Sequence, residues 1–186
     1  MDQRALIERA QRGDHDAFAS LVDGAIARLD QAARLILRDP ELARDAVQEA
    51  FLRAWRDLPG LRDPDRFDAW LHRLTVNACL DLVRKQKRRP IEVNLTPIDI
   101  PGSSDASGGL EDRDLLDAAL RRLAPGHRAV VVMHYFLGMP LPEVAASLGI
   151  PAGTAKSRLH YSLAQMRASV LGPVAAPASL AGGHVA

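Results

Sequence analysis

Hydrophobic positions along the chain recur at intervals of three and four residues, the spacing of helices that each bury one face. Strand-like alternation is poor. The β-branched run at 129–133 lies between helical patterns, so we interpret it as a buried helical segment. Asp39-Pro40, Pro59-Gly60 and Gly138 interrupt the pattern. The pattern predicts helices near 2–11, 14–38, 40–58, 66–88, 112–123, 126–137, 141–148 and 152–170.

These helices fall into two blocks separated by residues rich in helix breakers. Residues 90–110 combine prolines, glycines and serines with no sustained periodicity, which is typical of a linker. Residues 172–186 are mostly Ala, Gly and Pro and are expected to form a disordered tail. The predicted fold is therefore all-α, with two small helical domains at 1–89 and 111–171 joined by a flexible linker.

The helix predicted at 40–58 has two contrasting faces on a helical wheel. Its outward face places Leu52 among acidic and amide side chains. This face is either a solvated surface with one stray leucine or a docking surface for a basic protein helix. The inward side chains are Ala43, Val47, Ala50, Phe51, Ala54, Trp55 and Leu58, and the outward ones are Asp45, Gln48, Glu49, Leu52 and Arg53.

The helix predicted at 66–88 ends in a dense cationic run, and five of the six residues at 84–89 are Lys or Arg. Such a run is either a solvated helix end or a track for nucleic-acid phosphates, and its density favours the track. Asn77 could read a base edge. Phe67 and Trp70 could stack on bases, although aromatics at this spacing more often lie in a core. Arg73, Asn77, Leu80 and Arg84 share one stripe, opposite the inward Leu71, Leu74, Ala78, Cys79 and Leu82.

Near the other end, two short helices flank a turn at Gly149, which predicts a helix-turn-helix whose second helix enters the DNA major groove. Val144, Ala145, Leu148 and Ile150 would form the small core beneath it. In the second helix, Ala155, Leu159, Leu163 and Met166 should face inward, and the outward set is Thr154, Lys156, Ser157, Arg158, His160 and Tyr161.

Composition and charge narrow the function classes. The chain is 47% hydrophobic and 25% charged with a net charge of +1, but residues 1–60 hold 11 acidic and 9 basic groups and residues 72–89 hold 1 and 6. This asymmetry suggests two surfaces for two kinds of partner. The single cysteine, Cys79, faces inward, and no spacing suggests a metal, a cofactor or a catalytic centre. No segment is long and apolar enough to span a membrane, so we expect a cytoplasmic protein. Because no catalytic motif is present, we also expect that the protein is not an enzyme.

Four stretches in order resemble the extracytoplasmic-function (ECF) sigma factors, group IV of the bacterial sigma-70 family. The segments at 45–55 and 66–81 resemble the polymerase-binding helix and the promoter-melting helix of sigma region 2. The segments at 123–133 and 153–159 resemble region 4. The chain departs from the family pattern in two ways. Pro140-Leu-Pro142 replaces a frequent Ser or Thr cap, and Tyr161 and Leu163 stand where basic residues are common.

The resemblance implies an alternative sigma factor that directs core RNA polymerase to specific promoter DNA and is controlled by an anti-sigma factor. A second hypothesis is a stand-alone helix-turn-helix regulator that binds duplex DNA. Under the first, the loop at 59–65 and Asn77 would capture an unstacked minus-ten base. The implied polymerase-binding residues are Asp45, Gln48, Glu49 and Leu52. The implied minus-ten residues are Arg73, Asn77, Arg84, Lys85, Lys87 and Arg88, and the implied minus-thirty-five residues are Thr154, Lys156, Ser157, Arg158, His160 and Tyr161.

Overall fold

The computed structural model describes residues 2–88 and 110–171, and within these ranges every regular element is a helix. The first half contains α1 (Gln3–Gln11), α2 (His15–Leu37), α3 (Pro40–Asp57) and α4 (Phe67–Arg88), with 3-10 turns at Leu58–Gly60 and Pro64–Arg66 between α3 and α4. The second half contains α5 (Leu110–Arg121), α6 (Pro125–Val131), α7 (Leu141–Leu148) and α8 (Ala152–Leu171). The all-α prediction is confirmed.

Local sequence signals set most helix boundaries. Asp14 caps α2 by accepting a hydrogen bond from the Ala17 amide at 3.0 Å, and Asp39 caps α3 through the Glu41 and Leu42 amides at 2.9 and 3.0 Å. Pro40 occupies the first turn of α3, where a missing amide hydrogen costs nothing. The ends predicted for these helices therefore lie within about one residue of those in the structure.

The helix predicted at 126–137 differs in detail from the structure. It begins at Pro125 and is α-helical to Val131, after which Val132–Phe136 form a wider π-helical turn. The Leu137 amide donates to the Val132 carbonyl at 2.9 Å, which is the i to i+5 spacing of such a turn. The β-branched run at 129–133 is buried and helical, as predicted, but hydrophobic periodicity does not indicate that the helix widens there.

Small residues bring the helices of the first half close together. Ala43, Ala46, Ala50 and Ala54 recur along one face of α3 and are each 0% exposed. This stripe allows α3 to pack closely against its neighbours α2 and α4, and Leu71, Val76 and Cys79 of α4 are buried in the same core.

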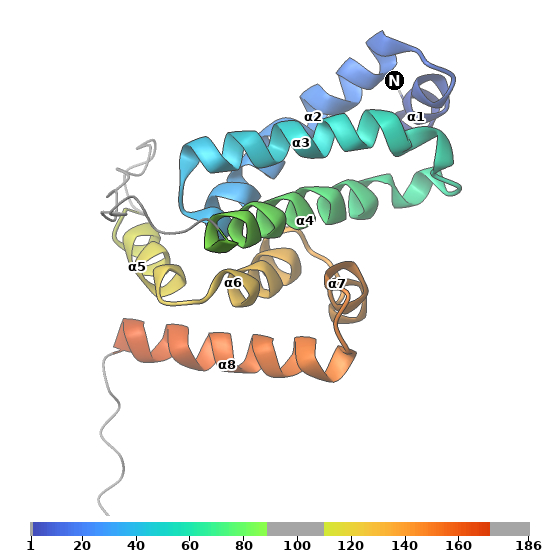
Figure 1. Cartoon of the computed structure of the whole chain (residues 1–186). Coiled ribbons are helices and arrows are strands. Elements are labelled where there is room, and N and C mark those ends of the chain that lie inside the picture. The colour runs from blue at the N-terminus through green and yellow to red at the C-terminus, as the bar shows by residue number, and fades with distance from the viewer. Residues whose placement is uncertain (1, 89–109, 172–186) are drawn as a thin grey trace, which may run out of the picture.

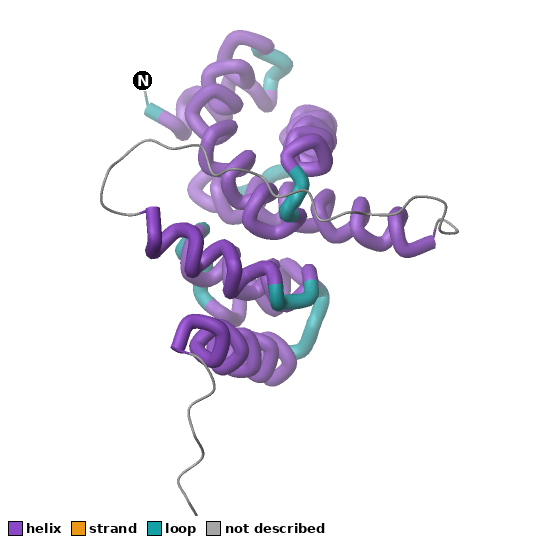
Figure 2. Tube along the Cα trace, turned by 90° about the vertical axis from the view of Figure 1, so that its left-hand side faces the viewer, coloured by secondary structure: helices purple, strands orange, loops and turns teal. Residues whose placement is uncertain are grey.

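The second half packs directly against the first. Helices α6 and α7 and the π-helical turn contact α2 and α4, and one hydrophobic cluster runs through both halves from Ile7 to Val144. In Figure 1, α5–α8 lie together beneath α2–α4, and the turned view in Figure 2 shows the same two stacked groups of helices. The chain thus buries one continuous core across the two predicted blocks.

The predicted tail at 172–186 lies outside the described residues. So does the predicted linker at 90–110, apart from Leu110, which is the first residue of α5. Among the helices that the structure describes, none is long and apolar enough to cross a membrane.

Candidate partner-binding and nucleic-acid interfaces

An apolar groove of about 750 Å³ runs between α2 and α3. Leu52 stands at its edge with 61% of its surface exposed, and Ile26 of α2 is 45% exposed. Trp55 lies at the centre of an aromatic cluster. Its ring stacks on that of His15 with the centroids 4.5 Å apart, and it contacts Phe18 edge-on with the centroids 5.0 Å apart. An exposed apolar surface of this kind is typical of a site that binds a partner.

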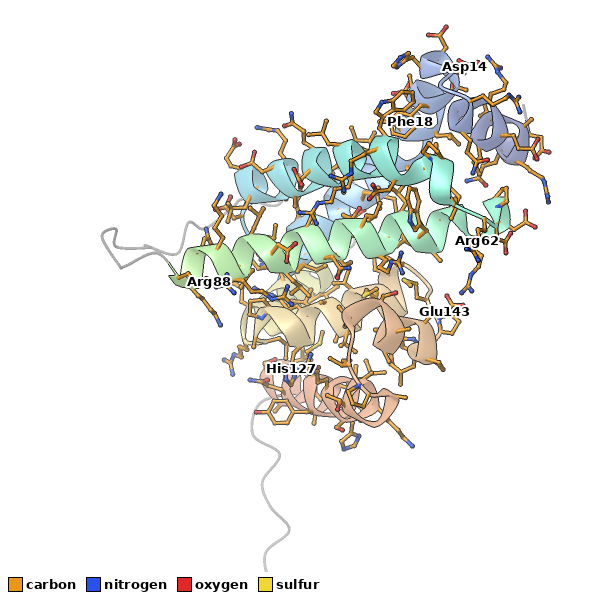
Figure 3. All side chains as sticks on the ribbon, turned by 45° about the vertical axis from the view of Figure 1, so that its right-hand side comes forward. Asp14, Phe18, Arg62, Arg88, His127 and Glu143 are labelled. Carbon is orange, nitrogen blue, oxygen red and sulfur yellow. The ribbon has the colours of Figure 1, made fainter. Side chains whose placement is uncertain are left out.

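A helical wheel of α3 alone does not show this groove, because residues of both α2 and α3 form it. Phe51 and Trp55 were predicted to be buried, but both are only partly buried because they form a wall of this groove. Phe18 and Ile26 were missed altogether, since they come from α2 and only packing brings them beside Leu52. Figure 3 shows Phe18 on α2, pointing toward α3.

Polar side chains of both signs line the groove, namely Asp30, Arg34, Arg44 and Gln48. Asp45, Gln48 and Glu49 are exposed as predicted, and Gln48 lines the groove itself. Glu49 accepts a hydrogen bond from Arg53 at 2.7 Å, and Arg53 reaches Asp81 of α4 at 3.2 Å. These two carboxylates, Glu49 foremost, raise the pKa of Arg53. Arg53 therefore ties the groove to α4 and partly neutralises Glu49.

Helix α4 presents the predicted cationic side chains to solvent. Arg73, Lys85, Lys87 and Arg88 are exposed, and Arg84 is exposed while its guanidinium contacts Asp81 at 2.8 Å. Arg88 extends from the end of the helix in Figure 3. This end of α4 can therefore meet a polyanion without first breaking a buried contact.

Two residues of the predicted α4 stripe are less exposed to solvent than Arg73 and Arg84. Asn77 is partly buried, and Leu80 packs against the hydrophobic core. Arg73 lines a cleft with residues of α7. The stripe therefore runs along the border of the second half of the molecule, a position that a single-helix projection does not reveal.

The suggestion that Phe67 stacks on bases is wrong. Phe67 is 2% exposed and belongs to the core, and its ring lies 5.9 Å from that of Trp70. Trp70 is partly buried and lines the cleft between α4 and α7. Burial of Phe67 follows the common rule for aromatic residues on the apolar face of a helix.

The predicted helix-turn-helix is formed by α7 and α8. Gly149 ends α7 at φ +62°, the left-handed conformation that favours glycine. Val144 and Ala145 are buried, whereas Leu148 and Ile150 are partly buried. Ala155 is fully buried, and Leu159, Leu163 and Met166 are partly buried. The outward positions Lys156, Ser157, His160 and Tyr161 are exposed, whereas Thr154 and Arg158 are partly buried.

His127 of α6 contacts two residues of α8, Ser162 and Tyr161. The buried Ser162 hydroxyl lies 3.2 Å from Nδ1 of His127, and the edge of the His127 ring meets Tyr161 with centroids 5.4 Å apart. Burial, and then the charge of Arg158, lowers the pKa of His127. Tyr161 is thus positioned by packing. Figure 3 shows His127 of α6 facing α8.

The start of α7 lacks a side-chain cap, as expected from Pro140. Its Glu143 instead accepts a hydrogen bond at 3.1 Å from Arg66, the last residue of the 3-10 turn before α4. In Figure 3, Glu143 lies on the side of α7 next to the turn that carries Arg62. The Glu143 carboxylate, which in a capping box would bind the start of α7, therefore links the first half of the chain to the second.

Cys79 is fully buried, and burial raises the pKa of its thiol to about 12. The thiol is accordingly a core group with little thiolate character. Among the described residues, no cluster of His, Cys, Asp and Glu has the makings of a metal site.

The two halves together define a helical DNA-binding protein with a helix-turn-helix and a separate apolar groove. The models of Sigma-70 region 2 and Sigma-70 region 4 match residues 21–89 and 113–166. The chain belongs to the ECF sigma factors, which are DNA-binding transcription-initiation factors and not enzymes.

Relatives extend over most of the chain. It is 36% identical to the ECF RNA polymerase sigma factor SigM of Mycobacterium tuberculosis, across 83% of this chain and 77% of SigM. It is 30% identical to the ECF RNA polymerase sigma factor SigW of Bacillus subtilis, across 87% and 92% of the two chains. The structure of CnrH in complex with the cytosolic domain of CnrY matches with a TM-score of 0.63 at 30% identity, covering 89% of this chain and 95% of CnrH.

Proposed function

We propose that the α2–α3 groove is the surface through which this sigma factor binds core RNA polymerase. The observation that carries the proposal is Leu52, which is exposed beside an apolar groove on the same helix as the exposed Asp45, Gln48 and Glu49. An amphipathic helix with an apolar stripe and basic flanks matches this surface in shape and charge. The groove is made by region 2, and no residue of the helix-turn-helix lines it.

We propose two DNA contacts for the same molecule. On α4, Arg73, Arg84, Lys85, Lys87 and Arg88 would hold phosphates of the minus-ten element while Asn77 reads a base. On α8, Lys156, Ser157, His160 and Tyr161, flanked by Thr154 and Arg158, would enter the major groove of the minus-thirty-five element. Two weak contacts on one chain gain affinity only when both are engaged at once.

We also propose that an anti-sigma factor controls this protein, which we place in the cytoplasm. The support is the relative CnrH, whose structure includes the cytosolic domain of CnrY. A regulator that covers the α2–α3 groove would compete with polymerase for the same apolar surface.

The test is in vitro transcription with core RNA polymerase and a library of bacterial promoter fragments. We expect promoter-dependent transcripts only when the sigma factor is added, and none when both Glu49 and Leu52 are substituted by Ala. Binding of the same double variant to DNA should match wild type. Transcripts that do not depend on the sigma factor, or a fully active double variant, would contradict the proposal.

A further inference from the structure

The last residue of α1, Gln11, is hydrogen-bonded to the turn that joins α3 to α4. Its side-chain amide donates to the Leu58 carbonyl at 3.2 Å and to the Leu61 carbonyl at 2.7 Å. A glutamine amide carries two N–H donors, so this side chain uses both of them on one turn. The Leu58 carbonyl also accepts a hydrogen bond from the Leu61 amide at 3.0 Å. Gln11 therefore holds the carbonyls at either end of the 3-10 turn at a fixed separation.

Two further contacts from α1 reach the end of the turn nearer α4, but they are weaker. Gln3 donates to Asp68 at 2.9 Å, and the Arg4 guanidinium lies 3.5 Å from the Asp65 carboxylate. These four side chains are all exposed, and exposed polar pairs contribute little to stability. Gln11 is partly buried, so water competes less for its two hydrogen bonds. Gln11 therefore provides most of the polar connection between α1 and the turn.

Helix α1 is itself fixed to the core of region 2. Its Ile7 and Ala10 are 1% and 3% exposed and belong to the main hydrophobic cluster. The helix packs along α2 and also contacts both 3-10 turns between α3 and α4. Gln11 thus extends from a rigid support, and a side chain on such a support can set the position of the backbone that it binds.

The turn that Gln11 holds is exposed in its middle and adjoins the proposed minus-ten surface. Arg62 and Asp63 are exposed, and Figure 3 shows Arg62 on this turn. Leu61 lines the same cleft as Arg73 of α4, so the turn and the cationic stripe are neighbours. The middle of the turn is therefore free to contact a DNA base, while Gln11 fixes the end of the turn nearer α3.

We infer that Gln11 is a positioning residue for minus-ten recognition: by holding residues 58–61, it places the middle of the turn where it can receive an unstacked base. A turn that is already ordered spares the complex the entropy cost of ordering it when the base binds. Without the Gln11 hydrogen bonds, the turn must become ordered during base capture. The inference deepens the proposed minus-ten contact of region 2 and rests on it, although Gln11 itself need not contact DNA.

The experiment measures base capture by the full-length chain bound to core RNA polymerase. A promoter fragment carries 2-aminopurine at successive non-template positions of the minus-ten element, and its fluorescence rises when the base leaves the stack. Gln11→Met keeps the length of the side chain but cannot donate, and Gln11→Glu keeps its shape but only accepts. Each should lower the equilibrium constant for base capture about tenfold, because two hydrogen bonds are lost. In Gln11→Met, polymerase affinity and the salt dependence of promoter binding should be unchanged, because the phosphate contacts remain.

A rescue variant and a matched control accompany these substitutions. Gln11→Lys should restore most of the base capture, because an ammonium group can again donate to both carbonyls. Gln31→Glu makes the same chemical change at an exposed position of α2 and should leave base capture unchanged. Base capture that Gln11→Met leaves at the wild-type level, or that Gln11→Lys does not restore, would overturn the inference.

Hydrogen exchange on the free chain separates this inference from the proposed function. The Leu61 amide should exchange several times faster in Gln11→Met than in wild type, because the turn is held less firmly. The Ala50 amide, in the buried part of α3, reports any change in overall stability and should exchange at the wild-type rate. Equal exchange of the Leu61 amide in the two chains would also overturn the inference. A wild-type complex that unstacks no base would instead contradict the proposed minus-ten contact, and the exchange rates would still decide whether Gln11 orders the turn.

Discussion

At the scale of single residues, the side chains that matter most are those whose exposure conflicts with their chemistry. Leu52 is apolar and exposed, whereas Arg128 is charged and buried. Both arrangements cost free energy in the isolated chain. We assign the first to polymerase docking, whereas the second lies where α6 packs against α2, within reach of the charge of Arg38.

Leu52→Ala should weaken binding to core RNA polymerase about 10- to 100-fold, because about 1.5–3 kcal/mol is gained when a leucine side chain is buried. Folding stability should change little, since Leu52 is mostly exposed in the free chain. Fluorescence anisotropy of the labelled sigma factor titrated with core enzyme measures the affinity. Tyr135→Ala is the matched control, because Tyr135 is 60% exposed but lies in region 4. An equal reduction of affinity in both variants would contradict a specific role for Leu52.

The stability of the chain should fall as the pH is lowered from 7 to about 5. Burial lowers the pKa of His72, and burial followed by the charge of Arg158 lowers that of His127. Because the unfolded histidines titrate near 6.5, the unfolded state binds more protons below that pH, and stability present above it is lost. Denaturant unfolding at several pH values measures the slope. His72→Gln should reduce the slope, and a slope that this substitution leaves unchanged would contradict the role of His72.

At the scale of elements, α4 combines two functions along its length. Its side chains pack against α2, α3 and region 4 as far as Val83, and Arg84–Arg88 project as a cationic end. The packed part fixes the direction of the exposed end, so the cationic end is held by a rigid helix. The same division explains why Phe67 lies in the core while Arg88 reaches solvent.

Lys85→Ala and Lys87→Ala should each reduce the salt dependence of promoter binding by the polymerase complex. Removing the cation that neutralises one phosphate should lower the slope of log K against log salt by about 0.7–0.9, because fewer counterions are released on binding. The slope is measured by filter binding between low and moderate salt. Arg12→Ala removes an exposed cation at the end of α1 and should leave the slope unchanged. Identical slopes in all variants would exclude the cationic end of α4 from phosphate binding.

At the scale of the whole molecule, one core joins the two regions. Met133 of region 4 is fully buried and belongs to the same hydrophobic cluster as Ile36 and Val76 of region 2. A shared core couples the stability of the two regions for as long as they remain in contact. The two regions should therefore unfold as a unit.

Met133→Ala should lower the free energy of unfolding by about 2–5 kcal/mol through reduced burial and a residual cavity. Because the core is shared, the fluorescence of Trp55 and Trp70, both in region 2, should report the shift although the substitution lies in region 4. Urea unfolding followed by tryptophan emission and by circular dichroism makes the comparison. Leu116→Ala, at an exposed position of α5, should change stability by less than about 0.5 kcal/mol. A tryptophan transition unmoved by Met133→Ala would show that the regions unfold separately.

The sequence by itself determined the helices, their approximate ends and the polar faces of α3, α4 and α8. These follow from periodicity, from caps such as Asp39 and from breakers such as Gly149, all of which act over a few residues. Only the tertiary structure decided that Phe18 and Ile26 complete the groove beside Leu52. It also decided that Asp117 and Glu143 reach arginines of region 2. These contacts join residues from different helices, and a pattern within one helix carries no information about which neighbour packs against it.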